Sequence, residues 1–402
     1  MAGLTLPAAA WRQREGLDLL CDTLGARDGA VRYVGGAVRD ALLAIDVADL
    51  DLATIHAPDE VIARLDGARI KAVPTGLAHG TVTAVLPGGP VEITTLRRDM
   101  ATDGRHAVVA FTDDWRADAA RRDFTINALY ADPLSGAIFD YFDGVVDLRA
   151  GRVRFIGDPL ERIAEDHLRI LRFFRFQARF GQVIDQDGLA ACVARANDLM
   201  ALSRERIAAE LLRLLVARDA ASVVRLMVAR NILAPVLPEI GDLARFERIV
   251  RREDAASMKG SALLRLVGLL STDSVDDVGA RLKLSNADRK RIRIAAQPLL
   301  TGDPLVLRYR LGAVGARDQL LLSDLDDAAV AQKLRVVDTA PLPAFTLTGG
   351  ALVERGVRKG PDVARLLRQI EDQWIAEGFP PANRVDQMAA ATVARWRDDS
   401  IA

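Results

Sequence analysis

The sequence predicts an α+β head followed by an all-helical remainder. Within the first 150 residues, short apolar runs with two-residue alternation are separated by glycine and proline turns, which is typical of strands. From about residue 158 onward, apolar residues recur at helical spacing in one segment after another. A chain of 402 residues is long enough for two to four domains, each with its own core.

The head is organised around residues 31–55, whose pattern is that of a strand, a glycine turn, a helix and a second strand. The expected elements are a strand at 31–34, a tight turn at Gly35-Gly36, a helix at 37–44 and a strand at 49–54. A glycine turn ahead of a helix lets backbone N–H groups approach a phosphate closely. This order of elements is therefore typical of a phosphate-binding site.

The second of these strands carries two acidic residues, Asp49 and Asp51. Because side chains alternate along a strand, both carboxylates are expected on one face. Adjacent carboxylates repel each other unless a cation lies between them, and such hard oxygen ligands suit Mg²⁺. Taken alone, this Asp-x-Asp pattern is more often a solvated strand face. Together with the glycine turn it indicates metal-assisted phosphoryl or nucleotidyl transfer.

Two further features of the head follow along the chain. Residues 75–97 alternate in two runs joined by a Pro-Gly-Gly-Pro turn, which predicts a hairpin. In its second run Glu92 is a candidate third carboxylate near the metal, and an exposed edge-strand residue is an equally good interpretation. Residues 98–118 are polar and poorly periodic, so we expect a long loop there.

The segment RRDFTINALYAD, residues 121–132, predicts the start of a helix with two arginines in front. An arginine side chain can bind phosphate oxygens through paired hydrogen bonds, which makes Arg122 a candidate nucleotide contact. An Arg-Arg-Asp run is more often a surface cluster of ion pairs, so the residues alone leave both interpretations open.

A polar ridge is predicted on a helix over residues 159–180. Asp166, Arg169, Arg172 and Arg175 recur every three residues, and neighbours at that spacing meet on a helix surface. Asp166 can accept a hydrogen bond from the exocyclic amino group of C or A, and Arg169 can donate to a ring nitrogen or carbonyl. Uracil has no amino group and offers no such match. A solvated arginine-rich face is the commoner explanation of such a pattern.

The composition excludes a polycation and offers no membrane-spanning segment. Net charge is −1, no apolar run approaches a membrane span, and the N-terminus lacks the pattern of a secretory signal. Cys21 and Cys192 lie far apart, which favours the reducing cytoplasm. Nucleic-acid binding would need a local basic surface. Arg204 and Arg206, at the front of a predicted helix, could contact phosphate or be surface charges, and we favour surface charges.

Three of these segments resemble one family. The stretch GGAVRDALLAIDVADLD (35–51) is similar to the signature of the tRNA nucleotidyltransferases and bacterial poly(A) polymerases, and the class II branch of this polymerase-β-like superfamily fits best. RRDFTINA at 121–128 and the run from Glu165 to Phe176 match the family's next two motifs. A tail motif departs from the pattern, because Ala351 stands where the family has Asp.

The resemblance implies a polymerase-β-like nucleotidyltransferase head (1–150) followed by a helical neck (151–220), body (221–335) and tail (336–402). It implies addition of C, C and A to the 3′ end of tRNA from CTP and ATP. A poly(A) polymerase, a CC-adding or A-adding enzyme, and a non-catalytic RNA-binding relative are the alternatives.

The resemblance also assigns roles to residues. Asp49 and Asp51 would hold two Mg²⁺ ions, with Asp40 orienting the glycine turn. It implies as well a flexible loop that contains Asp103-Gly104-Arg105. The nucleotide would be bound by residues of all three motifs. Gly36, Arg39 and Arg122 would contact the triphosphate and ribose, and Asp166 and Arg169 would recognise the base. Arg172 and Arg175 would help to hold the nucleotide and the helix, and Asp123 and Asn127 would support the site.

Overall fold

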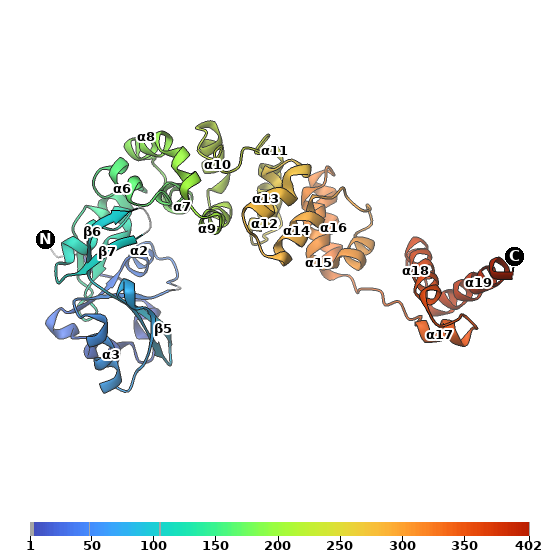
Figure 1. Cartoon of the computed structure of the whole chain (residues 1–402), viewed down its shortest axis with the longest axis horizontal. Coiled ribbons are helices and arrows are strands. Elements are labelled where there is room, and N and C mark those ends of the chain that lie inside the picture. The colour runs from blue at the N-terminus through green and yellow to red at the C-terminus, as the bar shows by residue number, and fades with distance from the viewer. Residues whose placement is uncertain (1–3, 48, 104–105, 402) are drawn as a thin grey trace. The chain divides into compact units, whose positions relative to one another are not determined.

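The computed structural model describes residues 4–47, 49–103 and 106–401, and it confirms an α+β head with a mostly helical remainder (Figure 1). Among the described residues, all named strands lie before residue 141. The chain folds as two compact units, one formed by 1–247 with 260–289 and the other by 248–259 with 290–402. The division into head, neck, body and tail stays a prediction.

The head is built on a seven-stranded mixed sheet in the order β3-β4-β5-β2-β1-β8-β9. β2 runs parallel to β5 and antiparallel to β1, which in turn pairs antiparallel with β8. This order brings the two predicted strands of residues 31–55 together near the middle of the sheet. The strands are β1 (Val31–Val34), β2 (Asp51–Thr54), β3 (Lys71–Gly76), β4 (Thr81–Leu86), β5 (Gly89–Thr95), β8 (Leu129–Ala131) and β9 (Ile138–Asp140).

The central strand–turn–helix is confirmed, with one correction. β1 matches the predicted strand, and α2 (Gly36–Leu42) follows it directly. Gly35 has φ 66° and ψ −117°, a backbone conformation that is almost confined to glycine, so the turn depends on this residue. The prediction of a strand from residue 49 was wrong by two residues. β2 begins at Asp51, and Asp49 lies exposed ahead of it rather than alternating with Asp51 along a strand.

The predicted hairpin of residues 75–97 is confirmed by the pairing of β4 with β5.

The prediction of a long loop at 98–118 was wrong. Residues 97–111 form a two-stranded antiparallel sheet of β6 (Arg97–Asp103) and β7 (His106–Phe111), followed by α4 (Trp115–Ala120). The two strands pair only with each other in the described structure, so they lack the apolar alternation of a half-buried strand. Gly104 and Arg105 of the implied flexible loop lie outside the described residues.

Two helix predictions were also wrong in detail. Residues 121–132 do not begin an α-helix but form a short 3₁₀ turn, η4 (Thr125–Asn127), that leads into β8. Residues 159–180 form two helices, α6 (Pro159–Glu165) and α7 (Arg169–Phe180), separated by a break. Asp166 is extended there (φ −150°, ψ 104°), and its carboxylate accepts the backbone N–H of Leu168 at 3.1 Å. An Asp that bonds a nearby backbone N–H competes with continuation of a helix.

Aromatic side chains fasten α7 to the head. Phe124, which follows the Arg-Arg-Asp run, is fully buried and packs against Phe155, Phe173 and Phe176 with ring centroids 4.9–6.2 Å apart. Phe173 also stacks on Phe155 with the rings 9° from parallel. Aromatic pairs in such geometries contribute about 0.5–1.5 kcal/mol each beyond their buried area. Packing of its apolar face therefore fixes the position of α7, and the polar face of the helix lies toward the glycine turn.

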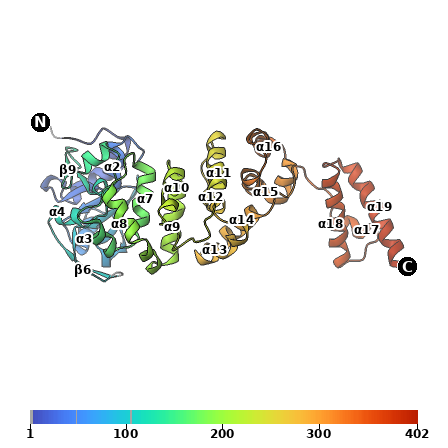
Figure 2. The same ribbon diagram turned by 90° about the horizontal axis from the view of Figure 1, so that it is seen from above.

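Helices surround this core and continue along the chain, and α7 packs beside α9 and α10 (Figure 2). Those of the first part are α1 (Leu17–Thr23), α3 (Pro58–Gly67), α5 (Gly144–Arg149), α8 (Gln186–Ala194), α9 (Arg204–Leu215) and α10 (Ala220–Ala229). The short 3₁₀ helices, apart from η4, are η1 (Ala10–Gln13), η2 (Ala26–Asp28), η3 (Leu77–His79), η5 (Ala196–Ala201) and η6 (Thr272–Ser274).

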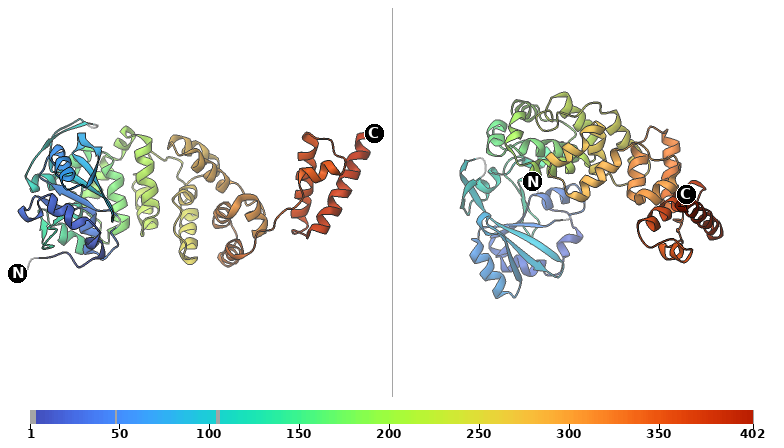
Figure 3. Two further views of the ribbon diagram at one scale, coloured as in Figure 1. Left: turned by 90° about the horizontal axis from the view of Figure 1, so that it is seen from below. Right: turned by 45° about the vertical axis from the view of Figure 1, so that its right-hand side comes forward.

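The C-terminal helices have a core of their own, in which Trp374 packs among Tyr309, Phe345 and Phe379. The red helices of Figure 3 are α17, α18 and α19, which contact one another. No helix in the described part of the chain is long and apolar enough to cross a membrane. The later helices are α11 (Ala244–Ala255), α12 (Ala262–Leu269), α13 (Val275–Arg281), α14 (Asn286–Ala296), α15 (Pro304–Leu322), α16 (Asp327–Thr339), α17 (Gly349–Glu354), α18 (Pro361–Ala376) and α19 (Ala382–Ile401).

Candidate active site

One cavity of about 610 Å³ gathers almost all of the residues that the sequence singled out. Its walls come from the glycine turn, the acidic segment, the Arg-Arg-Asp run and α7, which are far apart in the chain. Of the ten predicted site residues, only Glu92 does not line it. The lining residues are Gly35, Gly36, Arg39, Asp49, Asp51, Arg122, Asp123, Asn127, Asp166, Arg169, Arg172, Arg175, Phe176 and Arg213.

One wall of the cavity is acidic. Asp51 and Glu92 are register partners on the parallel strands β2 and β5, so their side chains are neighbours on one face. Burial raises the pKa of Asp51 to about 6, with further increases from Glu92 and Asp49 and an opposing effect of Arg122. Within the described residues no group of three or more acidic, histidine or cysteine side chains is arranged so that it could hold a metal ion. The carboxylates at this wall are Asp51 and the exposed Asp49, with the exposed Glu92 beside them.

Arg39 connects the glycine turn to the rest of the site. Its guanidinium is buried, donates to Asp40 at 2.7 Å and to the Asn127 side-chain oxygen at 2.5 Å, and lies over the Phe180 ring at 4.2 Å. Burial lowers the pKa of Arg39 from its ordinary value, and Asp40 opposes that change. The prediction that Asp40 orients the turn agrees with this contact, because Asp40 holds the arginine rather than lining the cavity.

Arg122 is fixed in place by a buried carboxylate that the sequence analysis did not single out. It donates to Asp118 at 3.0 Å and to the Tyr130 hydroxyl at 3.1 Å. Burial alone would raise the pKa of Asp118, but the charges of Arg122 and Arg121 lower it to about 2. A Cβ on Gly35 would lie 3.5 Å from an Arg122 nitrogen, so arginine and glycine turn are immediate neighbours. Arg122 can therefore face a phosphate bound at the turn.

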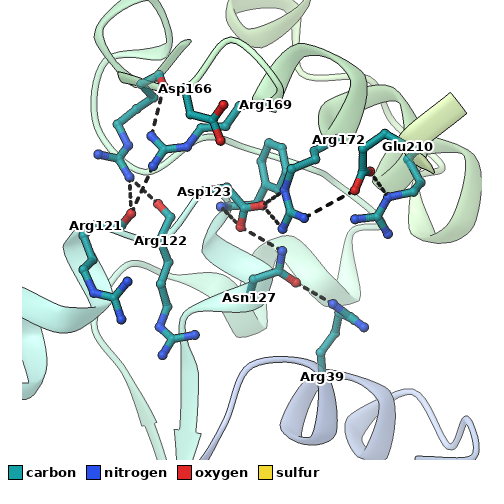
Figure 4. Close-up of polar contacts among 12 residues, drawn as sticks. Arg39, Arg121, Arg122, Asp123, Asn127, Asp166, Arg169, Arg172 and Glu210 are labelled. Atoms are coloured by element: carbon teal, nitrogen blue, oxygen red, sulfur yellow. Dashed lines mark hydrogen bonds and ion pairs between the residues drawn. The ribbon is translucent and has the colours of Figure 1, made fainter. Parts of the chain in front are cut away.

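Asp123 connects the Arg-Arg-Asp run to α7 (Figure 4). It accepts from the Asn127 amide at 2.9 Å and from Arg172 at 2.5 and 2.8 Å, so Arg39, Asn127, Asp123 and Arg172 form one chain of contacts. Burial would raise the pKa of Asp123, yet Arg172 and the hydrogen bond from Asn127 lower it. The role of support predicted for Asp123 and Asn127 fits this geometry.

The network continues onto α9 through Glu210, which is 4 % exposed. Its carboxylate accepts from Arg175 at 2.5 Å and lies 3.8 Å from Arg172 and 3.5 Å from Arg213. Arg172 and Arg175 thus line the cavity while bonded to protein carboxylates. Their geometry favours a part in holding α7 in place, and direct contact with a nucleotide stays a prediction.

The two residues predicted to recognise the base lie at the break between α6 and α7. Arg169 donates to Glu165 at 2.6 Å and to the backbone carbonyls of Arg162 and Arg121 at 2.9 and 3.3 Å. A guanidinium has five N–H donors, so donors remain for a ligand. Asp166 is on the turn before α7, and the prediction that it continues a ridge on the same helix was wrong.

Asp166 has an unexpected partner in Arg206, near the start of α9. One Arg206 nitrogen donates to both Asp166 oxygens, at 2.9 and 3.1 Å. Arg206 is exposed, as expected of a surface charge, and its partner is a carboxylate of the candidate site. Because the pair joins residues 166 and 206, it could not be inferred from local spacing.

Comparison with known proteins identifies the family. Residues 31–154 match the model of the poly A polymerase head domain, and residues 183–243 match the probable RNA and SrmB-binding site of polymerase A. The human protein "CCA tRNA nucleotidyltransferase 1, mitochondrial" is 33 % identical over 91 % of this chain and 87 % of its own. The chain belongs to the CCA tRNA nucleotidyltransferase family. A CCA-adding enzyme of Levilactobacillus brevis is 31 % identical over 90 % of this chain and 93 % of its own.

A solved structure supports the same membership in the CCA tRNA nucleotidyltransferases. The Bacillus stearothermophilus CCA-adding enzyme in complex with CTP superposes with a TM-score of 0.76 at 25 % identity, covering 96 % of this chain and 98 % of that one. The likeness extends over the head and the helical remainder alike. The polymerase-β-like interpretation of the fold is thereby confirmed.

Several residues of this CCA tRNA nucleotidyltransferase site were missed by sequence reasoning. Asp118 and Glu210 contact the predicted site residues Arg122 and Arg175, and Arg213 lies near Glu210 and lines the cavity. Glu210 carried a readable signal, since it lies on the same side of its helix as the apolar Ile207 and Leu211. A glutamate there requires a positive partner once it is buried.

Proposed function

We propose that this protein adds C, C and A to the 3′ end of tRNA, using CTP and ATP and no nucleic-acid template. The observation that carries the proposal is one cavity lined both by the acidic pair Asp49 and Asp51 and by Asp166 and Arg169. A reaction that joins a chosen nucleotide to a hydroxyl needs a place for the reacting phosphate and a place for the base. The names of the relatives, which refer to CCA addition, agree with this assignment.

The acidic pair is proposed to hold Mg²⁺, as two ions. Asp51 is raised in pKa to about 6 and receives no hydrogen bond from the described residues, so a cation would relieve an unfavourable charge. A divalent ion bound there would lower the pKa of the tRNA 3′-hydroxyl and stabilise the departing pyrophosphate. Glu92 is proposed as a third carboxylate that supports Asp51 from the neighbouring strand.

The remaining residues are proposed to bind and orient the nucleotide. The backbone N–H groups at Gly36 and the guanidinium groups of Arg39 and Arg122 surround the place where a triphosphate would lie. Each arginine is already oriented by a carboxylate or amide, so little reorganisation accompanies binding. Asp166 would accept from the amino group of C or A, and Arg169 would donate to the adjacent ring nitrogen or carbonyl.

The chain is also proposed to act in the cytoplasm and to divide into a head, a neck, a body and a tail with boundaries near residues 150, 220 and 335. Both cysteines, Cys21 and Cys192, are free and buried, which fits a reducing compartment. The family members of human and mouse carry "mitochondrial" in their names, so localisation by a fluorescent fusion in the native cell is the direct test.

Extension of a tRNA that lacks its terminal CCA tests the proposed activity. With CTP alone the product should carry only added C, and with CTP and ATP it should end in CCA. Long A tails from ATP alone would identify a poly(A) polymerase, and A added only to tRNA ending in CC would identify an A-adding enzyme. Asp49→Asn and Asp51→Asn should each abolish extension, whereas Asp46→Asn, an exposed residue of the same segment outside the cavity, should not.

A further inference from the structure

One buried arginine beside the site, Arg162 in α6, has no part in the proposed chemistry. It is 8 % exposed and does not line the cavity. Its Nη2 donates to the backbone carbonyls of Arg121 and Arg122 at 2.5 and 2.7 Å, and its Nη1 donates to Glu165 at 2.5 Å. Burying a guanidinium is costly unless acceptors surround it, so these three contacts are what permit an arginine at this position.

The two carbonyls belong to the stretch of backbone from which Arg122 reaches the cavity. α4 ends at Ala120, and Arg121 is its C-cap residue. Carbonyls at the C-terminal end of a helix have no partner within the helix and must find one elsewhere. Arg162 supplies that partner, so it fixes the chain at the point where the side chain of Arg122 leaves it.

The same acceptors also bind Arg169, the residue proposed to donate to the base. Nη1 of Arg169 donates to the same oxygen of Glu165, Oε2, at 2.6 Å, and Nη2 donates to the same carbonyl of Arg121 at 3.3 Å (Figure 4). A further bond joins Nη1 of Arg169 to the carbonyl of Arg162 at 2.9 Å. The two arginines share a carboxylate oxygen and a backbone carbonyl, and the position of one guanidinium therefore constrains the position of the other.

We propose that Arg162 is a positioning residue for base selection, which holds Arg169 at a fixed place relative to the backbone that carries Arg122. The base can be read only if its edge meets Arg169 while the triphosphate lies at Arg122. Because a hydrogen bond weakens steeply with misalignment, a small displacement of Arg169 is enough to reduce the discrimination between C and U. This inference rests on the proposed function, which assigns base recognition to Arg169 and triphosphate binding to Arg122.

The test measures equilibrium binding of CTP and UTP to the full-length protein, together with kcat/KM for each nucleotide in tRNA extension. Arg162→Lys keeps the positive charge but loses the planar fork that reaches two carbonyls and a carboxylate at once. The preference for CTP over UTP should fall by about tenfold, the factor that corresponds to one lost hydrogen bond to a charged group. Arg162→Gln, which has no charge, provides a second measurement and should lose at least as much of the preference.

Arg252→Lys is the matched control for loss of a buried arginine. Arg252 is 5 % exposed and donates to three backbone carbonyls and to Asp327, but it belongs to the other compact unit and does not line the cavity. Both lysine variants should lower the midpoint of thermal unfolding. Only Arg162→Lys should change the preference between CTP and UTP in the binding measurement.

A double variant decides whether Arg162 acts through Arg169. In a protein that already carries Arg169→Ala, the change Arg162→Lys should cause no further loss of preference. The inference is overturned if both Arg162 variants keep the wild-type preference, if they weaken CTP and UTP binding equally, or if their effect persists in full without Arg169. A wild type that neither extends tRNA nor prefers CTP over UTP would overturn the proposed function, and the inference with it.

Discussion

The buried carboxylate of Glu210 offers the sharpest test of how the site is held together. Glu210→Gln keeps the size of the side chain and removes its charge. Arg175 then loses its ion-pair partner, and Arg172 keeps only Asp123. Glu210 is 4 % exposed and the Arg175 side chain 12 % exposed, so water compensates poorly for the lost charge.

The magnitude follows from this burial. Removing one partner of a buried ion pair costs about 3–5 kcal/mol, and the lower end applies because Arg172 retains a second carboxylate. A loss of about 3 kcal/mol lowers the midpoint of thermal unfolding by about 6–12 °C for a folded unit of this size. The same change should weaken CTP and ATP binding, since α7 carries Arg169 as well as the two arginines.

Differential scanning calorimetry of the full chain measures the unfolding midpoint, and nucleotide titration measures binding. Glu205→Gln is the matched control, because Glu205 lies on the same helix but pairs with Lys283 at an exposed position. Exposed pairs contribute little, so this variant should match the wild type. If Glu210→Gln unfolds within about 2 °C of Glu205→Gln, less than 1 kcal/mol separates them and the reasoning from buried charge is refuted.

Three other predictions follow from single contacts. Asp51→Asn should stabilise the metal-free protein above about pH 6, by up to about 2 kcal/mol after allowance for partial exposure, and should have no effect below about pH 4. The reason is that a carboxyl with its pKa raised to about 6 costs stability only once it is ionised. Calorimetry with a chelator across this pH range checks the sign, and a lower unfolding midpoint for the variant at about pH 7 contradicts the prediction. Arg206→Ala should leave stability within about 0.5 kcal/mol, as its pair with Asp166 is partly exposed, yet increase incorporation of UMP, as measured by sequencing the extended tRNA. Gly35→Ala should lower the free energy of unfolding by about 1–3 kcal/mol, because φ is 66° there. Gly36→Ala should cost less than half as much, since Gly36 begins a helix and a Cβ on it has no atom nearer than 3.7 Å. Equal effects of the two variants on the denaturation midpoint would argue against strain at the turn.

Features that depend on local sequence were predicted well. The strand, turn and helix of residues 31–42 follow from neighbouring residues, because a glycine turn and apolar alternation act over a few positions. The end of a helix is also local, yet the break after α6 was missed. The run from Asp166 to Arg175 has continuous i, i+3 spacing, and this obscured the turn signal of Asp166, whose carboxylate accepts the backbone N–H of Leu168 ahead of α7.

Features that depend on distant partners could not be predicted from one sequence. The pairing of Asp166 with Arg206, and of Arg122 with Tyr130, becomes visible only when α9 and β8 are placed beside the cavity. Arg206 looks like an ordinary surface charge in the sequence. The two-stranded sheet of residues 97–111 was missed for another reason, because the described strands pair only with each other and the segment carries no clear periodic signal in the sequence.

The charge of the cavity explains why its arginines are already paired before any ligand binds. Six arginines and four aspartates line it, so two positive charges are in excess. Isolated arginines would be costly to hold so close together, and Asp123 with the buried carboxylates of Asp118 and Glu210 offsets that repulsion. Once Asp118 and Glu210 are counted with the four aspartates, six carboxylates balance the six arginines. The arrangement therefore keeps the arginines rigid while their guanidinium groups still line the cavity, and because the arginines need not move, they can bind a metal–nucleotide complex without a cost of reorganisation.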